Sequence, residues 1–503
     1  MKLRIFLCVI GVVVADGPAR YDTIVVGLGS AGVTAASTLA RTGRRVLGIE
    51  AQGRIGGRVH TVAFGDGLVE LGGEWVLGTK NSRTYAAAQQ HNVTIIPQDW
   101  SKLVYYSDGT PADSQLISQL AEHRFDDGPD PPEAQGNFTT GKILEDITKN
   151  RPDLLKDQDF ISGILSFVEL MVNNLEGSSD WNEVTTGGDY EDLEGDQSLS
   201  WHRHGYKTFF DIMLNTYKGG PGLPNLDLKL NTEVKVIRAP QHPTECVIVE
   251  CSDGSLYEAD NVIVTVSLGV LKDKKSTLFS PPLPEDKQTA INKISMGVLD
   301  KVVLAFDQPW WTQNISRFLF IWKEADRKKV PALDLWTTKV VGASRPMGSS
   351  NTLTLWISGN IAKEVETLSE DTVKTKCVAL LQRFMGDTLK VTVPEPTAIL
   401  RTTWYSNPYT RGSYTFDNTL TPQYPDARDW LARPLTDSSG APRVLFAGEA
   451  TNRRHFGTVH GASETGYREA MRLVNKTYIT IYPIFWGDKP HGWPTKSGRW
   501  PNK

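Results

Sequence analysis

The sequence predicts a two-domain α/β protein in which a nucleotide-binding type of sheet is interrupted twice. At 503 residues the chain is too long for one compact core. A strand, a glycine-rich turn, a helix and a second strand follow one another within residues 21–50. Strand-rich stretches return at residues 226–266 and 444–447, separated by long segments of different character. We therefore expect one discontinuous domain with a second domain inserted into it.

The boundaries follow from these shifts in pattern. Residues 101–224 alternate helical stretches, such as 161–175, with acidic and glycine-rich loops, and a separate strand set occupies 301–306 and 352–357. A last buried strand at 444–447 precedes a last helix at 463–475. The expected division is a leader at 1–15, a nucleotide-binding domain at 21–100, 225–295 and 396–480, a mixed-sheet-plus-helices domain at 101–224 and 296–395, and a C-terminal tail at 481–503.

The first unit has the form of a βαβ crossover. Residues 21–26 read as a buried strand that runs directly into glycine. Residues 30–42 form a helix of small side chains, and Gly43 supplies its C-terminal cap. Residues 45–49 form the second strand, which ends at Glu50. The parallel crossover predicts a Rossmann-like arrangement.

The turn between strand and helix has the spacing of a dinucleotide site. Gly27, Gly29 and Gly32 fit G-x-G-x-x-G, with Ser30 and Ala31 opening the helix. The helix N-terminus offers free N–H groups and partial positive charge to a pyrophosphate. Glu50 is placed to accept hydrogen bonds from ribose hydroxyls and repels a 2′-phosphate, so NADP is disfavoured. NAD and FAD both remain possible on these residues alone.

Three separated segments resemble the flavin-containing amine oxidase family. They are Arg54-Ile55-Gly56-Gly57-Arg58 followed by Glu70-Leu71-Gly72-Gly73-Glu74-Trp75, then Phe446-Ala447-Gly448-Glu449-Ala450-Thr451, and then Gly457-Thr458-Val459-His460-Gly461-Ala462. The resemblance implies bound FAD, with Arg58 on the phosphates and Glu449 on the ribityl chain. Its remaining cofactor contacts fall on Gly72, Gly73, Glu74, Trp75, Val234, Gly448, Thr458 and Val459. No cysteine lies in the C-terminal motif, so a non-covalent flavin is expected.

The resemblance also implies catalytic residues. Residues 296–311 are similar to the family segment whose lysine reaches flavin N5 through a water, which assigns that role to Lys301. On a strand, Lys301 shares a face with Val303 and is expected to point into apolar surroundings. Residues 404–414 closely resemble the animal polyamine oxidases, the spermine and N1-acetylpolyamine oxidases, and there Tyr414 is an aromatic wall beside the amine. Thr458 lies opposite, as in those enzymes.

Two positions concern the substrate tunnel. Glu176 resembles the family glutamate that points into the tunnel, whereas Leu77 stands where plant polyamine oxidases have glutamate and animal ones histidine. Residues 176–200 hold eight Asp or Glu and no Lys or Arg. The acidic side chains there either concentrate polycations near the site or form a solvated loop. They are Asp189, Glu191, Asp192, Glu194 and Asp196.

The N-terminus and the Asn-X-Ser/Thr sites favour secretion. Lys2 and Arg4 precede ten apolar residues and small residues ending at Ala15, which is typical of a signal peptide and too short to span a bilayer as an anchor. Glycosylation acceptors are expected at Asn92, Asn137, Asn314 and Asn475. Cys246 and Cys251 are expected to lie on opposite faces of a strand and to remain unpaired.

Composition excludes several other classes. Charged residues make up 22% and the net charge is −4, without a basic block, so no nucleic-acid partner is expected. His202 and His204 lack further spaced ligands, so no metal is expected.

The sequence thus predicts a secreted FAD-dependent amine oxidase that passes hydride from a polyamine or N-acetylpolyamine to flavin N5 and reduces O₂ to H₂O₂. The alternatives are an L-amino-acid or monoamine oxidase of the same superfamily, and a secreted flavoprotein without activity. An amino-acid oxidase needs an arginine facing the flavin, which the sequence does not locate.

Overall fold

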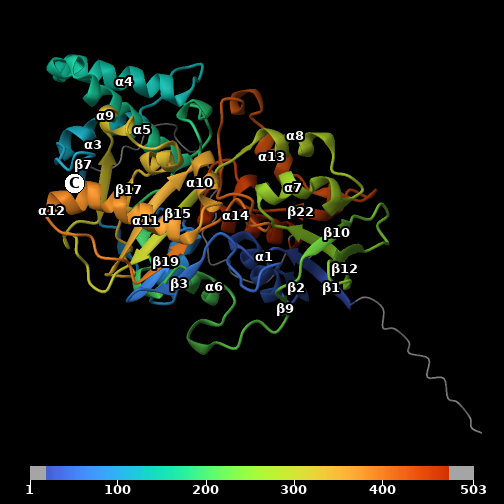
Figure 1. Cartoon of the computed structure of the whole chain (residues 1–503). Helices are drawn as coiled ribbons and strands as arrows, with labels where there is room; N and C mark the ends of the chain where they lie inside the picture. Colours follow the sequence, from blue (N-terminus) through green and yellow to red (C-terminus); the bar gives the residue numbers. More distant parts are fainter. Residues whose placement is uncertain (1–18, 475–503) are drawn as a thin grey trace, which may run out of the picture.

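The computed structural model describes residues 19–474, and its strands form two main sheets (Figure 1). The expected leader, the acceptor Asn475 and the C-terminal tail lie outside the described residues. In Figure 1, β1, β2, β10, β12 and β22 gather on one side and β15, β17 and β19 on the other, with α1 and α14 near the middle. The α/β class is therefore confirmed, with each main sheet in its own part of the molecule.

The first sheet has nine strands and a parallel centre. Its order is β13-β10-β11-β12-β1-β2-β9, with β22 beside β12 and β21 beside β22. The strands are β1 (Ala19–Val26), β2 (Val46–Ile49), β9 (Leu226–Lys229), β10 (Val234–Arg238), β11 (Val247–Cys251), β12 (Leu256–Val264), β13 (Phe279–Ser280), β21 (Leu435–Thr436) and β22 (Pro442–Phe446). β1 pairs in parallel with β2 and β12, and β12 with β22. Their carboxyl ends therefore meet at one edge, where open α/β sheets bind ligands.

Two helices from segments far apart in sequence pack together against this sheet. α1 (Ser30–Arg41) packs along α14 (Val459–Val474). The approach is close because a Cβ on Gly466 would lie 2.1 Å from the carbonyl oxygen of Ala31. α14 begins at Val459, four residues before the predicted start at Ser463. The motif residues Thr458 and Val459 therefore lie at the helix N-terminus itself.

The second sheet has six strands in the order β19-β15-β18-β17-β16-β7. They are β7 (Lys102–Tyr106), β15 (Leu299–Ala305), β16 (Arg317–Ile321), β17 (Gly342–Ser344), β18 (Thr352–Ser358) and β19 (Ala398–Arg401). β15 pairs antiparallel with both β18 and β19, whereas β16 and β7 run parallel. β19 thus belongs to this sheet, although the boundary expected at residue 396 placed it with the nucleotide-binding domain.

Helices cover both faces of the second sheet. α5 (Gln158–Glu176) packs with β16 and β18 and ends at Gly177 in the left-handed conformation. The other helices are α2 (Arg83–Gln90), α3 (Ser114–Glu122), α4 (Gln135–Asn150), α6 (Lys207–Met213), α7 (Leu268–Leu278), α8 (Glu285–Lys293), α9 (Glu324–Arg327), α10 (Gly359–Glu366), α11 (Glu370–Leu381), α12 (Asp387–Leu389) and α13 (Ala427–Ala432).

Three small sheets complete the fold. β3 (Thr61–Phe64) pairs with β4 (Gly67–Glu70), β14 (Ser295–Met296) with β20 (Thr415–Phe416), and β8 (Leu199–Ser200) with both β5 (Trp75–Val76) and β6 (Ile96–Pro97). Over residues 19–474 no helix is both long and apolar enough to cross a bilayer. In the same part of the chain Cys246, Cys251 and Cys377 are all free.

Candidate active site

The glycines of the first turn divide into packing and ligand-facing positions. Gly27 has φ +92°, which L side chains rarely adopt, and a Cβ on Gly32 would lie 1.9 Å from the Gly27 carbonyl oxygen. Gly29 differs, because its Cβ would meet no protein atom nearer than 3.8 Å. No side chain caps the helix that begins at Ser30. The turn therefore leaves room and N–H donors for a phosphate group from outside the protein.

Glu50 lies at the end of β2 beside this turn. Its two carboxylate oxygens accept from the backbone N–H groups of Leu28 (2.8 Å) and Gln52 (2.9 Å), and the residue is buried. These bonds fix the carboxylate in place and leave further lone pairs on both oxygens. The geometry fits the expected contact with ribose hydroxyls.

Arg58 and Glu449 form the other end of the site. Arg58 Nη1 donates to Glu449 Oε1 (2.8 Å) and to the Ser413 carbonyl (2.9 Å). Glu449 also accepts from the Thr415 hydroxyl (2.7 Å) and the Gly457 N–H (2.8 Å). Burial alone raises the pKa of Glu449, but Arg58 and then Thr415 outweigh burial, so this pKa lies below its usual range. Glu449 is therefore ionised, and Arg58 keeps its remaining donors for a phosphate.

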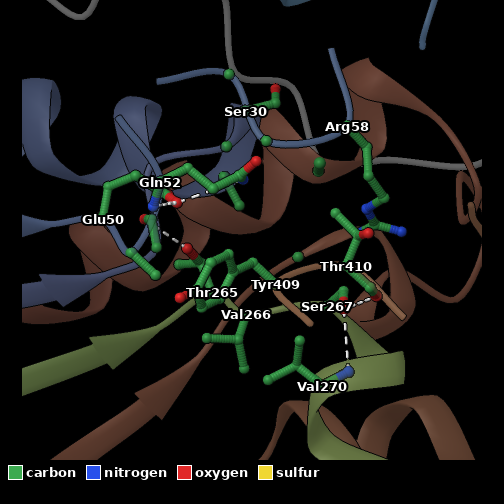
Figure 2. Close-up of a pocket in the computed structure, with 18 of the residues that line it drawn as sticks. Ser30, Glu50, Gln52, Arg58, Thr265, Val266, Ser267, Val270, Tyr409 and Thr410 are labelled. Carbon is green, nitrogen blue, oxygen red and sulfur yellow. Dashed lines mark hydrogen bonds between the residues drawn. The ribbon is translucent and has the colours of Figure 1, made fainter. Parts of the chain in front are cut away.

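One cavity joins these two ends (Figure 2). Figure 2 shows Glu50 and Gln52 on one side of it and Arg58 and Thr410 on the other, with Tyr409 between them. It holds about 1220 Å³ of atom-free space, its open mouth included.

Most of the sequence-predicted cofactor residues line this cavity. They are Gly27, Gly29, Ser30, Ala31, Glu50, Arg58, Gly73, Val234, Gly448, Glu449, Thr458 and Val459. Four others do not line it, namely Gly32, Gly72, Glu74 and Trp75. A Cβ on Gly72 would lie 1.9 Å from the Arg58 carbonyl oxygen, so this glycine serves the close approach of two backbone segments.

The cavity also includes residues that the sequence did not single out. Thr265 and Ser267 follow β12 at the same edge of the sheet, and the Thr265 hydroxyl donates to the Gly27 carbonyl (2.8 Å). Tyr409 and Thr410 enter from the loop after β19. The position of Thr265 after a buried parallel strand was the signal that could have indicated it.

Lys301 lies on β15 and is 3% exposed. Its ammonium donates to the carbonyls of Glu70 (2.7 Å) and Gly72 (3.1 Å) and forms an ion pair with Glu74 (2.8 Å). It also lies 4.4 Å from the ring centre of Trp356. Lys301 is thus buried, but its surroundings are not purely apolar as expected, because all three N–H groups of its ammonium have acceptors. Glu74, expected to contact the cofactor, pairs with Lys301.

Tyr414 lines the cavity and is anchored at its hydroxyl. The Tyr414 hydroxyl lies 2.9 Å from the Asn174 carbonyl and 3.0 Å from the Leu175 carbonyl, at the end of α5. Burial, and then the neighbouring Glu176, raise the pKa of the phenol above its usual range. A neutral, fixed ring is suitable as the predicted aromatic wall. Thr458 lines the same cavity from the start of α14.

Glu176 ends α5 next to this tyrosine anchor. Its carboxylate has no hydrogen-bond or ion-pair partner among the residues that the structure describes. Burial raises the pKa of Glu176 to about 7; Asp417 adds to the rise, and Arg428 opposes it. Asp417 and Arg428 pair with each other at 2.9 Å. Glu176 therefore lies near a second carboxylate, that of Asp417, and has no protein partner of its own, so it is available to a cationic ligand.

The acidic loop is largely neutralised by the protein itself. Asp189 pairs with Arg453 (2.5 Å), Glu191 with Arg454 (3.2 Å) and Glu194 with Lys80 (2.9 Å). Asp192 accepts from the Tyr190 hydroxyl (3.3 Å), and burial raises its pKa. These pairs reduce the field that a polycation would feel. Leu77 is half-buried after β5 and does not line the cavity.

Three residues near the start of α14 have the chemistry of metal ligands. Ligand atoms of His455, His460 and Glu464 lie within 4.8 Å of one another. His455 Nδ1 and Glu464 Oε2 are 2.7 Å apart and satisfy each other. Burial lowers the pKa of His460 to about 4, so its imidazole is neutral. The sequence indicated no such cluster, because its members lie outside any short metal motif.

The fold and cavity define an α/β protein with a nucleotide-type site at the carboxyl edge of its first sheet and a second domain built on the six-stranded sheet. The family described as flavin-containing amine oxidoreductase matches residues 30–474. The chain is 30% identical to the peroxisomal N(1)-acetyl-spermine/spermidine oxidases of Bos taurus and Homo sapiens, over 92% of this chain and 96% of each relative. It is 26% identical to the probable polyamine oxidase 5 of Arabidopsis thaliana, over 90% of this chain and 97% of that one. The chain therefore belongs to the flavin-containing amine oxidoreductase family.

Family membership confirms the resemblance and implies FAD in the cavity. The residues present fit that group: Gly29 leaves a space that a Cβ would fill, and the N-terminus of α1 has no side-chain cap. Glu50 lies at one end of the cavity and has carboxylate lone pairs left to accept hydrogen bonds. Arg58 lies at the other end and has guanidinium N–H groups left to donate.

Proposed function

We propose that this protein oxidises a polyamine or N-acetylated polyamine, with non-covalent FAD as its cofactor and O₂ reduced to H₂O₂. The observation that carries the proposal is Glu176, an acidic side chain without a protein partner beside the anchored Tyr414. A carboxylate in that position stabilises an ammonium group of a long amine. The printed names of the relatives, which are polyamine and acetylpolyamine oxidases, agree with this class.

Bound flavin supplies the hydride acceptor, and the chain prepares the amine. Glu176, when ionised, holds a charged nitrogen of the substrate. Tyr414 fixes the path of the chain through its ring, because its hydroxyl is committed to α5. The amine that reacts must be neutral, and removal of the reacting nitrogen from water disfavours its protonated form.

Lys301 contributes a fixed positive charge. Since its three N–H groups are bonded to Glu70, Gly72 and Glu74, it acts through that charge more than as a free donor. We propose that it promotes the reaction of the reduced enzyme with O₂, where negative charge develops. Its partners come from one continuous segment, residues 70–74, which begins at the last residue of β4.

The test is peroxide release by the purified protein with spermine, spermidine, their N-acetyl forms, monoamines and L-amino acids. Oxidation of a polyamine or an acetylated polyamine is the expected result. Oxidation of amino acids or monoamines alone would contradict the substrate class. Flavin should be released into solution on denaturation, since the C-terminal motif contains no cysteine.

We further propose that the protein is secreted. Its first fifteen residues have the pattern of a signal peptide, whereas two relatives are named as peroxisomal. Asn92, Asn137 and Asn314 are exposed, as glycosylation requires. Expression in a secreting cell line, followed by glycosidase treatment of the medium, tests this. Retention of all unglycosylated protein inside the cells would refute secretion.

A further inference from the structure

Lys102, Arg124 and Arg317 form a group of three positive charges, the cationic cluster, in the second domain. Arg317 on β16 and Lys102 on β7 are register partners in the parallel pair, so their side chains emerge side by side on one face. Arg124 lies in the short helix η1 (His123–Phe125), directly after α3. Like charges placed opposite each other across strands destabilise a sheet.

The protein does not compensate these charges. No carboxylate lies within 4 Å of any of the three cationic groups in the described part of the chain. The exposed Glu122 favours the charged forms of Lys102 and Arg124 from a distance. Glu74 favours the charged form of Arg317, but Glu74 is already paired with Lys301. Burial, together with mutual repulsion, lowers the pKa of Arg317 to about 10.

The cluster is shaped for an oxyanion. The Arg317 guanidinium stacks over Trp100 with 4.0 Å between its carbon and the ring centre, and its side-chain nitrogens have no protein acceptor within residues 19–474. A stacked guanidinium is held flat and presents its N–H groups at the edge, which matches a carboxylate. Arg124 similarly lies 3.9 Å from the ring centre of Phe125. Both Arg317 and Trp100 retain solvent exposure, so a ligand can reach them.

The cluster faces the same side of the sheet as the catalytic lysine. Arg317 is the register partner of Ser344, Ser344 of Thr354, and Thr354 of Val303, so these side chains lie on one face of the sheet. Lys301 is two residues from Val303 on the same strand and therefore lies on that face too. Three strand spacings separate β16 from β15, about 14 Å in all. Aromatic rings fill the interval: Trp75 lies 5.7 Å from Trp100 and 5.9 Å from Trp356.

We propose that the cationic cluster binds a carboxylate at the far end of the amine substrate. The substrate would be a long amine that carries positive charge near Glu176 and a carboxylate at the end that reaches Arg317. This inference rests on the proposed amine oxidation and narrows its substrate class. A free ammonium at the far end would be repelled, and a neutral acetamide would be tolerated.

Two acyl derivatives of one polyamine test the proposal. N1-acetylspermidine and N1-succinylspermidine share their amide and their amines, and only the second ends in a carboxylate. Calorimetric titration is carried out under anaerobic conditions with the flavin reduced beforehand, so that binding is measured without turnover. We expect the succinyl compound to bind about 10-fold more tightly or better, since one charge-assisted contact is worth that much.

Arg317→Gln should abolish this preference, and Lys102→Gln should reduce it. Arg203→Gln, which removes an exposed arginine elsewhere, should retain it. Equal affinities in the wild type, or a preference that survives Arg317→Gln, would overturn the inference. The wild-type comparison decides the matter even where a variant fails to fold. Tight succinyl binding without peroxide release from any amine would refute the proposed oxidation and leave the anion site standing.

Discussion

The buried pair of Lys301 and Glu74 permits a double-mutant test of the catalytic assignment. The two groups are 2.8 Å apart, with side chains 4% and 12% exposed. Lys301→Met keeps the length of the stem and removes the charge and all three donors. Glu74→Gln keeps an oxygen acceptor and removes only the negative charge. The double variant removes both charges.

The magnitudes follow from burial. Lys301→Met leaves the Glu74 carboxylate uncompensated, and breaking a buried pair from one side costs about 3–5 kcal/mol. Glu74→Gln should cost about 1.5–3 kcal/mol, because Lys301 loses a charge-assisted bond and keeps two carbonyl acceptors. The double variant buries no unpaired charge. Its loss of unfolding free energy should therefore be smaller than the sum of the two single-variant losses by about 1–3 kcal/mol.

Urea unfolding of the FAD-bound variants, followed by flavin fluorescence, measures this coupling. The exposed pair of Lys80 and Glu194, which lies at the similar distance of 2.9 Å, is the matched control, and its coupling energy should be less than about 1 kcal/mol. Stopped-flow reoxidation by O₂ adds the functional readout. Lys301→Met should slow it on the order of 100-fold, whereas Glu74→Gln retains the ammonium and should slow it far less. Additive stability effects, together with unchanged reoxidation in Lys301→Met, would refute the reasoning.

Three further predictions concern the cofactor and substrate. Gly29→Val should leave a folded protein without FAD, whereas Gly32→Val should disturb folding because its Cβ overlaps a backbone oxygen; absorbance and circular dichroism separate the two outcomes. Amine affinity should fall as pH drops below about 7, because the raised pKa of Glu176 protonates its carboxylate there. Glu176→Gln should remove this pH dependence and weaken binding by about one to two decades; an unchanged profile would contradict the role. Leu77→His should strengthen polyamine binding by restoring a polar group, and no change would place Leu77 outside the substrate path.

The sequence predicted the parts of the structure that local chemistry determines. The glycine spacing located Gly27, Gly29 and Gly32, and the end of the second strand located Glu50, because one βαβ unit contains all four. The strands at 301–306 and 352–357 were expected from their apolar patterns and are observed within two residues of those bounds. Such features depend on neighbours within one unit.

Pairings between distant segments could not be predicted in this way. Lys301 and Glu74 are separated by 227 positions, and nothing in either local pattern indicates the other. The acidic segment read equally well as a solvated loop or an attractive surface, because Arg453 and Arg454 reach it only in the folded chain. The register of β7 and β16, which sets Lys102 beside Arg317, likewise depends on tertiary structure.

The charges around the site are separated in space, and this bears on which amine fits. Glu176 is an acid without a protein partner, and the cationic cluster on the second sheet consists of bases without a carboxylate partner in the described part of the chain. Lys301 and Glu74 neutralise each other at 2.8 Å, so this pair adds no net charge. A uniform polycation would gain at Glu176 and lose at Arg317, whereas an amine with one acidic end would gain at both. Charge arrangement can therefore direct substrate choice away from that of relatives with 30% identity.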